Sequence, residues 1–236
     1  MGDVRFEVLG EVRAWVGDEV VDLGAARQRA VLAALVVDAG QTVMLDQLVE
    51  RVWGEHAPAA VSSTVRSYLS RLRTLFGDAA GFGIVRQTGG YLARIDPSTV
   101  DLNRFAGLLA AARQSTDEAR AEENYRRALG LWRDEAFAGL DSQWFAARRH
   151  ALGVARHTAI LDHLDLRLRR GGHAEALPEL VELAAGNPFD ERLAAQLMLA
   201  LYRSGRQAEA LAHFERVRSV LTDELGADPG PELRGL

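Results

Sequence analysis

Residues 62–76 read SSTVRSYLSRLRTLF, and their spacing predicts an amphipathic helix with two different faces. Val65, Leu69 and Leu72 recur at helical intervals and form an apolar stripe. The opposite face carries hydroxyl and arginine side chains, and no Asp or Glu occurs between residues 55 and 78. Small hydroxyls allow close approach and arginine forks onto phosphates or guanine, so this face suits nucleic acid. Taken alone, a solvated helix face is the alternative interpretation.

The composition bounds the class of protein. The chain has 236 residues, 48% of them hydrophobic, and a formal net charge of −5, which suggests one large or two ordinary globular domains. No apolar stretch is long enough to span a membrane, and the N-terminus does not look like a signal peptide. The slight acidity argues against a nonspecific polyanion binder, whereas a local basic patch still suffices for a specific one.

Several kinds of chemistry are excluded by residue usage. The chain has no cysteine, so it has no disulfide, thiol nucleophile or thiolate metal site. It also has no lysine, which removes a phosphate-loop lysine and a Schiff base. His150, His157 and His163 lack metal-ligand spacing, and no serine sits in a G-x-S-x-G context. We therefore expect no metal, no cofactor and no enzymatic activity.

The first part of the chain shows a definite order of elements. Alternating patterns and turn signals predict three short antiparallel strands, and helical spacing predicts three helices followed by a hairpin. This is the winged-helix arrangement, in which the third helix enters the major groove and the hairpin lies along the adjacent backbone. The predicted strands are residues 4–9, 11–16, 19–23, 84–87 and 91–95, and the first two helices are residues 25–38 and 44–53.

Three segments of this region resemble a known family. LDQLVERVWGE (45–55), TVRSYLSRLRTLFGD (64–78) and IVRQTGGYLARI (84–95) are similar to the OmpR-type winged helix, including its N-terminal strands. The resemblance implies that the 62–76 helix is the recognition helix and that the hairpin is the wing. The OmpR pattern usually has an acidic residue after the Thr-Val pair, where this chain has Arg66, and that difference fits a different set of DNA sites.

The candidate DNA-contacting residues lie on this helix and on the wing. The sequence leaves open whether Arg66 and Arg71 read guanine edges or hold phosphates. Arg73 lies nearer the buried side, so a structural role is open for it, and Thr64 could instead anchor the start of the helix. The full set is Ser63, Thr64, Arg66, Ser67, Ser70, Arg71, Arg73 and Thr74 from the helix, with Arg86, Thr88 and Arg94 from the wing.

The loop before the recognition helix is a second candidate surface. In OmpR-type activators this loop contacts RNA polymerase, and here it offers Gly54, Glu55 and His56. A connection of convenient length is the alternative.

The second part of the chain is helical in pattern and carries an internal repeat. The sequence AEAL recurs after 34 residues, at 174–177 and 208–211, and Gly171 is matched by Gly205. This is the tetratricopeptide period, and stacked helix pairs of that kind usually bind protein. A plain helical bundle is the alternative. The predicted helices are residues 102–113, 117–132, 142–170, 173–185, 191–204 and 207–225.

Other segments extend the resemblance to almost the whole chain. LWR (131–133), LMLALYRSGRQAEAL (197–211) and LGADPGPE (225–232) look like the bacterial transcriptional activation domain. A winged helix followed by this domain is the order found in the antibiotic regulatory proteins of streptomycetes. The family pattern continues with a helix after the proline-rich turn, so we expect either a shortened chain or the front part of a larger regulator with an ATPase domain behind it.

The predicted fold class is an α+β winged helix (residues 1–97) followed by an all-α, tetratricopeptide-like domain (residues 98–236). The resemblance implies a sequence-specific transcriptional activator that binds direct repeats of double-stranded DNA as a side-by-side dimer. It would recruit the RNA polymerase holoenzyme, including its sigma factor, to an antibiotic gene cluster, and it would lie in the cytoplasm with the nucleoid. A repressor with the same DNA contacts is one alternative. A tetratricopeptide-like scaffold for a protein partner is another.

Overall fold

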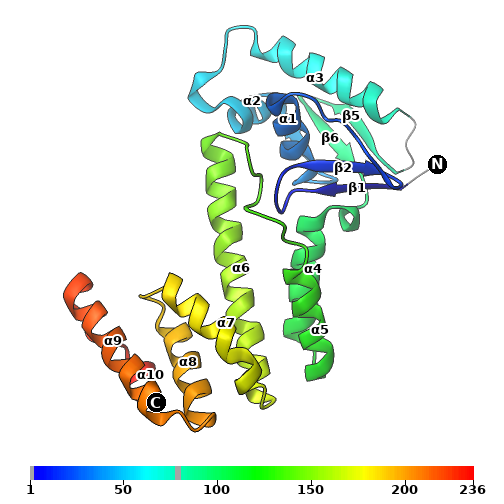
Figure 1. The fold of residues 1–236 in the computed structure, drawn as a ribbon. Helices are drawn as coiled ribbons and strands as arrows, with labels where there is room; N and C mark the ends of the chain where they lie inside the picture. The colour runs from blue at the N-terminus through cyan, green and yellow to red at the C-terminus, as the bar shows by residue number, and fades with distance from the viewer. Residues whose placement is uncertain (1–2, 78–80) are drawn as a thin grey trace. The chain divides into compact units, whose positions relative to one another are not determined.

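The computed structural model describes residues 3–77 and 81–236 (Figure 1). Packing divides the chain into two compact units. The first unit comprises Met1–Thr116 and Glu123–Arg156, and the second comprises Asp117–Glu122 and His157–Leu236. The first unit therefore extends past residue 97 to include residues 98–116 and 123–156.

The chain opens with the three-stranded sheet that the alternating pattern predicts. Strands β1 (Val4–Glu7), β2 (Arg13–Val16) and β3 (Glu19–Val20) pair antiparallel in that order. Val4 and Phe6 of β1 point to the interior, while Arg5 between them faces outward. The predicted strands are confirmed, each slightly shorter than its apolar pattern.

Helices α1 (Ala26–Val36), α2 (Leu45–Trp53) and α3 (Val61–Phe76) form the helical body of the winged helix. The apolar stripe of α3 is buried against this body, as its spacing predicts. Phe76 at the end of α3 packs with Phe6 and Phe82, with ring centroids 4.6–5.6 Å apart. The stripe therefore fixes which face of α3 is left outside.

The wing hairpin belongs to a second antiparallel sheet, in the order β4 (Thr42–Met44), β6 (Gly90–Arg94) and β5 (Gly83–Gln87). Strand β4 was not predicted, because it has three residues and only Val43 is buried. Gly90 pairs with Met44, and a Cβ at Gly90 would lie 2.4 Å from the Val43 carbonyl oxygen. The close approach of β6 to β4 therefore requires glycine at this position.

The winged helix continues into η2 (Pro97–Thr99), α4 (Asp101–Gln114), α5 (Glu118–Leu129) and the long helix α6 (Gln143–Arg169). Isolated parallel bridges join Phe6 to Val100 and Glu11 to Ala138. Backbone N–H groups of the 133–138 segment also donate to carbonyl oxygens of the 8–10 segment. The N-terminal sheet thus holds the start of the helical half as part of the same unit.

Asp101 lies at the centre of this connection. Its buried carboxylate accepts hydrogen bonds from the backbone N–H groups of Val8 and Leu9 at 2.8–3.0 Å and from the guanidinium of Arg133 at 3.1 Å. Burial raises the pKa of Asp101, while the hydrogen bonds from Leu9, Val8 and Arg133 oppose that rise. Asp101 therefore anchors the start of α4 to the end of the first strand.

The second unit contains the predicted helical repeat. It consists of the later part of α6 with α7 (His173–Gly186), α8 (Glu191–Arg203), α9 (Gln207–Leu225) and the short α10 (Pro231–Arg234), which was not predicted. Ala176 and Ala210, one period apart, are both buried, and Gly171 and Gly205 both adopt a left-handed conformation, with φ of 87° and 76°. The tetratricopeptide-like architecture is thus confirmed.

Across residues 3–77 and 81–236, no helix is long and apolar enough to cross a membrane.

Candidate nucleic-acid interface

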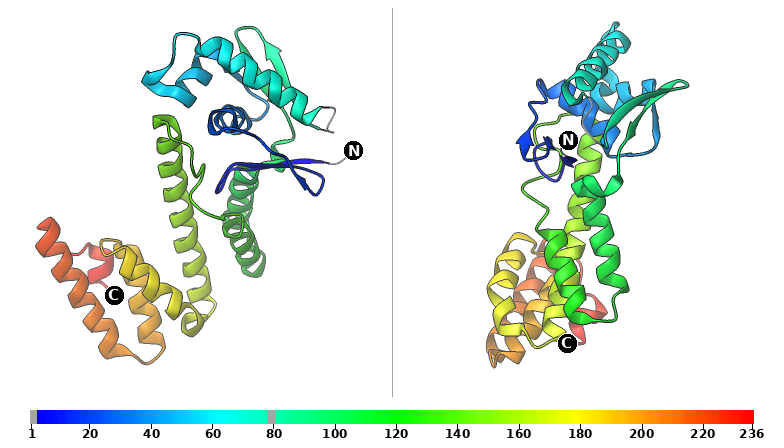
Figure 2. Two further views of the ribbon diagram at one scale, coloured as in Figure 1. Left: turned by 45° about the horizontal axis from the view of Figure 1, so that its top comes forward. Right: turned by 90° about the vertical axis from the view of Figure 1, so that its right-hand side faces the viewer.

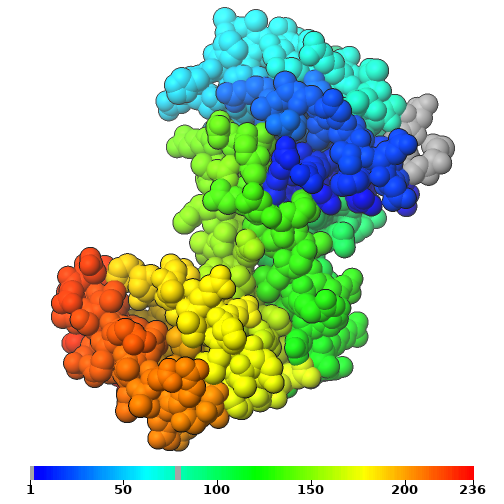
Figure 3. Space-filling model, viewed as in Figure 1, coloured from blue at the N-terminus to red at the C-terminus, as the bar shows by residue number. Residues whose placement is uncertain are grey.

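The outer face of α3 is exposed along its whole length. In Figure 3 this helix, drawn in cyan, lies at the surface of the first unit. The sequence of α3 contains no acidic residue. Its exposed polar side chains are Ser63, Arg66, Ser67, Ser70, Arg71, Arg73 and Thr74, whereas Thr64 is half-buried. The helix therefore presents hydroxyl and guanidinium groups without a carboxylate among them.

Some of these hydroxyls already have partners within the helix. Ser63 and Thr64 donate to the carbonyl oxygen of Ala60 at 2.7 and 3.3 Å, and Thr74 donates to the carbonyl oxygen of Ser70 at 3.2 Å. These bonds anchor the two helix ends and leave the hydroxyl oxygens able to accept.

Arg73 is engaged with the hairpin. Its Nε donates to the carbonyl oxygen of Ile84 at 2.8 Å, and its guanidinium lies 5.7 Å from the centroid of the Tyr91 ring. The structural role that the sequence left open for Arg73 is therefore present, because this side chain connects α3 to the wing.

The arginines of the winged helix fall into two groups, those that contact another described residue (engaged) and those that do not (unengaged). Within residues 3–77 and 81–96, the arginines without a hydrogen bond, ion pair or ring contact to a described residue all lie on α3 or the hairpin. The others contact a carboxylate, a backbone carbonyl or an aromatic ring, as Arg13 does with Glu11 at 3.3 Å. The unengaged set is Arg66, Arg71, Arg86 and Arg94, and the engaged set is Arg5, Arg13, Arg27, Arg29, Arg51 and Arg73.

The strand register places the three wing candidates differently. Arg86 pairs with Tyr91, two residues from the buried pair Ile84 and Ala93, so it emerges on the same side of the hairpin as α3. Thr88 is exposed at the turn, and the hairpin projects from the helices (right-hand view of Figure 2). Arg94 pairs with Gly83, at the other end of the hairpin and on its opposite face. The fold therefore groups Arg86 with α3 and separates Arg94 from it.

The loop before α3 begins with the short helix η1 (Gly54–His56), and Glu55 and His56 are exposed. Its base is fixed by an aromatic stack, in which the rings of Trp53 and Tyr68 are nearly parallel with centroids 6.4 Å apart. Arg27 packs over Trp53 and donates to the carbonyl oxygen of Val52. This support could not be predicted from the sequence, where its only signals are one arginine and two aromatic residues far apart in the chain.

No group of three or more His, Asp or Glu residues within the described ranges is arranged to hold a metal ion. The candidate surface consists instead of α3 and the hairpin, whose unengaged arginines have no partner among the described residues. The fold and this surface define a DNA-binding transcriptional regulator of the winged-helix class.

Comparisons with known proteins agree with that class. Residues 100–236 match the family described as "Bacterial transcriptional activator domain", and residues 18–91 match "Transcriptional regulatory protein, C terminal". The chain belongs to the Streptomyces antibiotic regulatory protein family of transcriptional regulators, in which a DNA-binding domain precedes the activator domain.

Individual relatives extend over the whole chain. Regulatory protein AfsR of Streptomyces coelicolor is 43% identical across 100% of this chain, and the chain spans 24% of that relative. Regulatory protein DnrI of Streptomyces peucetius is 32% identical, with 99% of this chain and 90% of the relative covered. A solved structure of Mycobacterium tuberculosis EmbR, in complex with a low affinity phosphopeptide, superimposes with a TM-score of 0.91 at 32% identity. That match covers 100% of this chain and 64% of EmbR, and it has the same winged-helix and helical architecture.

Proposed function

We propose that this chain is a sequence-specific transcriptional activator that reads DNA with α3 and the wing. The observation that supports this most strongly is the distribution of unengaged arginines, which in the winged helix occur on α3 and the hairpin alone among the described residues. A guanidinium without an internal partner is free to meet a phosphate or a base edge.

The residues of α3 divide into reading and anchoring groups. Arg66 and Arg71 extend from the exposed face and have no partner among the described residues, so they contact guanine edges or phosphates in the major groove. Ser67 and Ser70 lie on the same face and allow the helix to approach the bases closely. Ser63, Thr64 and Thr74 add hydroxyl oxygens at the two ends of the helix.

The wing supplies backbone contacts beside the groove. Arg86 and Thr88 lie on the α3 side and at the turn of the hairpin, where they meet the phosphates next to the recognition helix. Arg73 holds the hairpin against α3 and acts on DNA chiefly through that position. Arg94 lies on the other face and contributes a long-range charge or a contact to a neighbouring copy.

One recognition helix reads only a few base pairs, so we infer that two copies bind side by side on a direct repeat. Half-sites read from one side of the duplex are about one helical turn apart, or 10–11 bp. Activation follows by recruitment of RNA polymerase holoenzyme through the sigma factor, with contact from Gly54, Glu55 and His56. The helical half would supply contacts between copies and to the polymerase, and an antibiotic gene cluster is the expected target.

Selection of bound duplexes from a random DNA library, followed by footprinting, tests this proposal. The expected result is a direct repeat that is bound less tightly as salt rises, because each phosphate contact releases counterions. Transcription in vitro from a promoter carrying the selected repeat then distinguishes activation from repression. Activation that is lost in Glu55→Ala and His56→Ala, with DNA binding retained, supports recruitment through the loop.

Each part of the proposed function has its own result that would contradict it. An inverted repeat or a single half-site would overturn side-by-side binding. Reduced transcription at a bound promoter would make the protein a repressor. Recovery of no enriched sequence, together with capture of a protein partner by the helical half, would favour the scaffold.

A further inference from the structure

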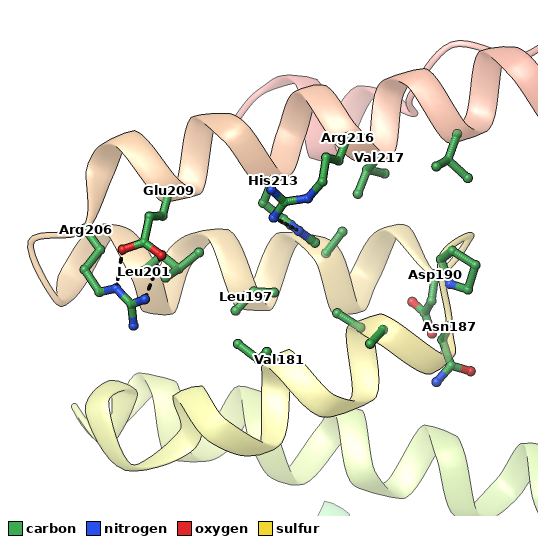
Figure 4. A pocket seen from close by; sticks show the side chains of 15 residues that line it. Val181, Asn187, Asp190, Leu197, Leu201, Arg206, Glu209, His213, Arg216 and Val217 are labelled. Atoms are coloured by element: carbon green, nitrogen blue, oxygen red, sulfur yellow. Dashed lines mark hydrogen bonds and ion pairs between the residues drawn. The ribbon is translucent and has the colours of Figure 1, made fainter.

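The second unit carries a groove between α7 and α9, with α8 as its floor (Figure 4). Its volume is about 460 Å³, and its floor and walls are mostly apolar, with Val181 of α7, Leu197 and Leu201 of α8 and Val217 of α9. Cavities of roughly 300–1,000 Å³ with apolar walls and a few convergent polar groups are typical of small-molecule sites.

Both carboxylates in this groove already have partners. Glu209 receives two hydrogen bonds from Arg206 at 2.6–2.7 Å, at the end of the groove near the α8–α9 turn. Asp190, at the opposite end, accepts from the Leu193 backbone N–H at 2.9 Å and lies 2.6 Å from Nε2 of His157. These polar groups bound the groove at its two ends and leave no carboxylate free within it.

Two basic side chains lie between these ends, and neither is paired with a carboxylate of the described residues. His213 and Arg216 lie against one another on α9, with Nη2 of Arg216 3.4 Å from Nδ1 of His213. A guanidinium can only donate, so Nδ1 is the acceptor and the neutral ring carries its proton on Nε2. Burial, with the nearby charge of Arg216, lowers the pKa of His213 and keeps the ring neutral.

The Nε2–H of His213 is then an unmet donor. His213 is only 8% exposed, and its Nε2 is buried without a hydrogen-bond partner among the described residues. An orphaned buried donor of this kind is costly unless another group pairs with it.

Arg216 adds an unmatched positive charge. Within the described part of the chain, no carboxylate lies at ion-pair distance from its guanidinium, although its charge helps to lower the pKa of Glu209 after the larger effect of Arg206. Glu209 is paired with Arg206, so the charge of Arg216 stays unmatched among the described residues. What is missing is a carboxylate paired with Arg216 and an acceptor for Nε2 of His213, among the described residues, and apolar surface lies beside both groups.

We propose that this groove binds a small organic acid with an apolar body. The carboxylate lies against the Arg216 guanidinium, and one of its oxygens accepts from Nε2 of His213 once the ring has turned outward about χ2. The apolar body rests on Val181, Leu197 and Val217. The bounded ends of the groove favour a small molecule over an extended peptide.

Octanoate is a suitable probe, with octan-1-ol and octylamine as controls of the same chain length. Titration into the full chain, followed by NMR of labelled Val and Leu methyl groups, reports on Val181, Leu197 and Val217 directly. Octanoate is expected to shift these signals to saturation, and to bind about tenfold or more tightly than either control, because a charge-assisted hydrogen bond is lost in both.

Matched variants locate the carboxylate. Arg216→Gln is expected to weaken octanoate binding about tenfold or more, whereas Arg218→Gln, which removes an arginine already paired with Glu215 at 2.8 Å, leaves it unchanged. His213→Phe keeps the packing volume and weakens binding roughly 2–10-fold. Thermal unfolding of each variant confirms that it is folded.

Three results would overturn the proposal. Octan-1-ol could bind as tightly as octanoate, which would leave no role for the carboxylate. Arg216→Gln could bind octanoate as the unaltered chain does. A peptide of alternating leucine and aspartate could occupy the groove more tightly than octanoate, which would identify a protein segment as the occupant.

Discussion

Oδ1 of Asp101 lies 2.8 Å from the backbone nitrogen of Val8, although 93 residues separate them in the chain. The bond joins the first helix after the winged helix to the end of its first strand. Arg133 completes the arrangement from the segment between α5 and α6. The first unit therefore includes part of the helical half, which is joined to the winged helix through a buried, hydrogen-bonded carboxylate.

Replacement of this carboxylate should destabilise the first unit. Asp101→Ala orphans the buried N–H groups of Val8 and Leu9, and each orphaned donor costs about 1–3 kcal/mol, so we expect a loss of at least about 2 kcal/mol. Denaturant unfolding measures the change. Asp96→Ala is the control, because Asp96 is an exposed carboxylate that accepts from the backbone N–H of Ser98, two residues away. The stability loss from Asp96→Ala should be clearly smaller. Equal losses would show that Asp101 is not an anchor.

The acid titration of Asp101 gives a second prediction. Burial raises its pKa in the folded protein, so the folded state holds the proton more tightly than the unfolded state. The stability gained from this tighter proton binding is complete below the pKa of the unfolded state and is lost as pH rises through the raised pKa of the folded state. The stability advantage of the unaltered chain over Asp101→Asn should therefore shrink from acidic to neutral pH. Unfolding curves at a series of pH values test this, and a growing advantage would contradict it.

Two glycines are expected to respond in opposite directions. Gly90→Ala places a Cβ against the Val43 carbonyl and should destabilise the wing sheet by about 1–3 kcal/mol or more. Gly107→Ala, in exposed α4 with no atom within 4 Å of the added Cβ, should stabilise by about 0.5–1 kcal/mol. Thermal unfolding distinguishes them, and a neutral Gly90→Ala would mean that β4 and β6 separate readily.

Substitutions of Arg73 and Arg71 should differ in their effect on the stability of the fold. Arg73→Ala loses the bond to Ile84 and the contact with Tyr91, so we expect a stability loss of about 1–2 kcal/mol together with weaker DNA binding through a displaced wing. Arg71→Ala removes no hydrogen bond, ion pair or ring contact to a described residue and should change stability by less than about 0.5 kcal/mol. Unfolding curves of the two variants are compared directly, and similar stability losses would contradict the assignment.

The helical face of α3 and the winged-helix order could be predicted from the sequence, because the spacing of Val65, Leu69 and Leu72 reports directly on burial. The repeat was equally visible, since equivalent residues such as Ala176 and Ala210 recur one period apart. Local patterns of this kind do not depend on distant parts of the chain.

The features that were missed depend on distant contacts or on very short segments. Asp101 reads as a polar boundary residue, and nothing near it in sequence indicates its partners at Val8 and Leu9. Strand β4 has one buried residue, and its identity as a strand comes from pairing with β6. The separation of Arg86 from Arg94 follows from hairpin register, which the sequence pattern alone had not resolved.

We propose that α3 reads DNA with its unengaged arginines. The most direct test is the affinity of Arg66→Ala and Arg71→Ala for the selected duplex, compared with Arg13→Ala, which removes an exposed arginine paired with Glu11 on the N-terminal sheet. An α3 variant that loses a base contact should bind about 1–3 kcal/mol more weakly. One that loses a phosphate contact should show a salt dependence that is lower by about one phosphate, while the Arg13 variant binds normally. Binding by the α3 variants that matches the Arg13 control in both affinity and salt dependence would contradict the account.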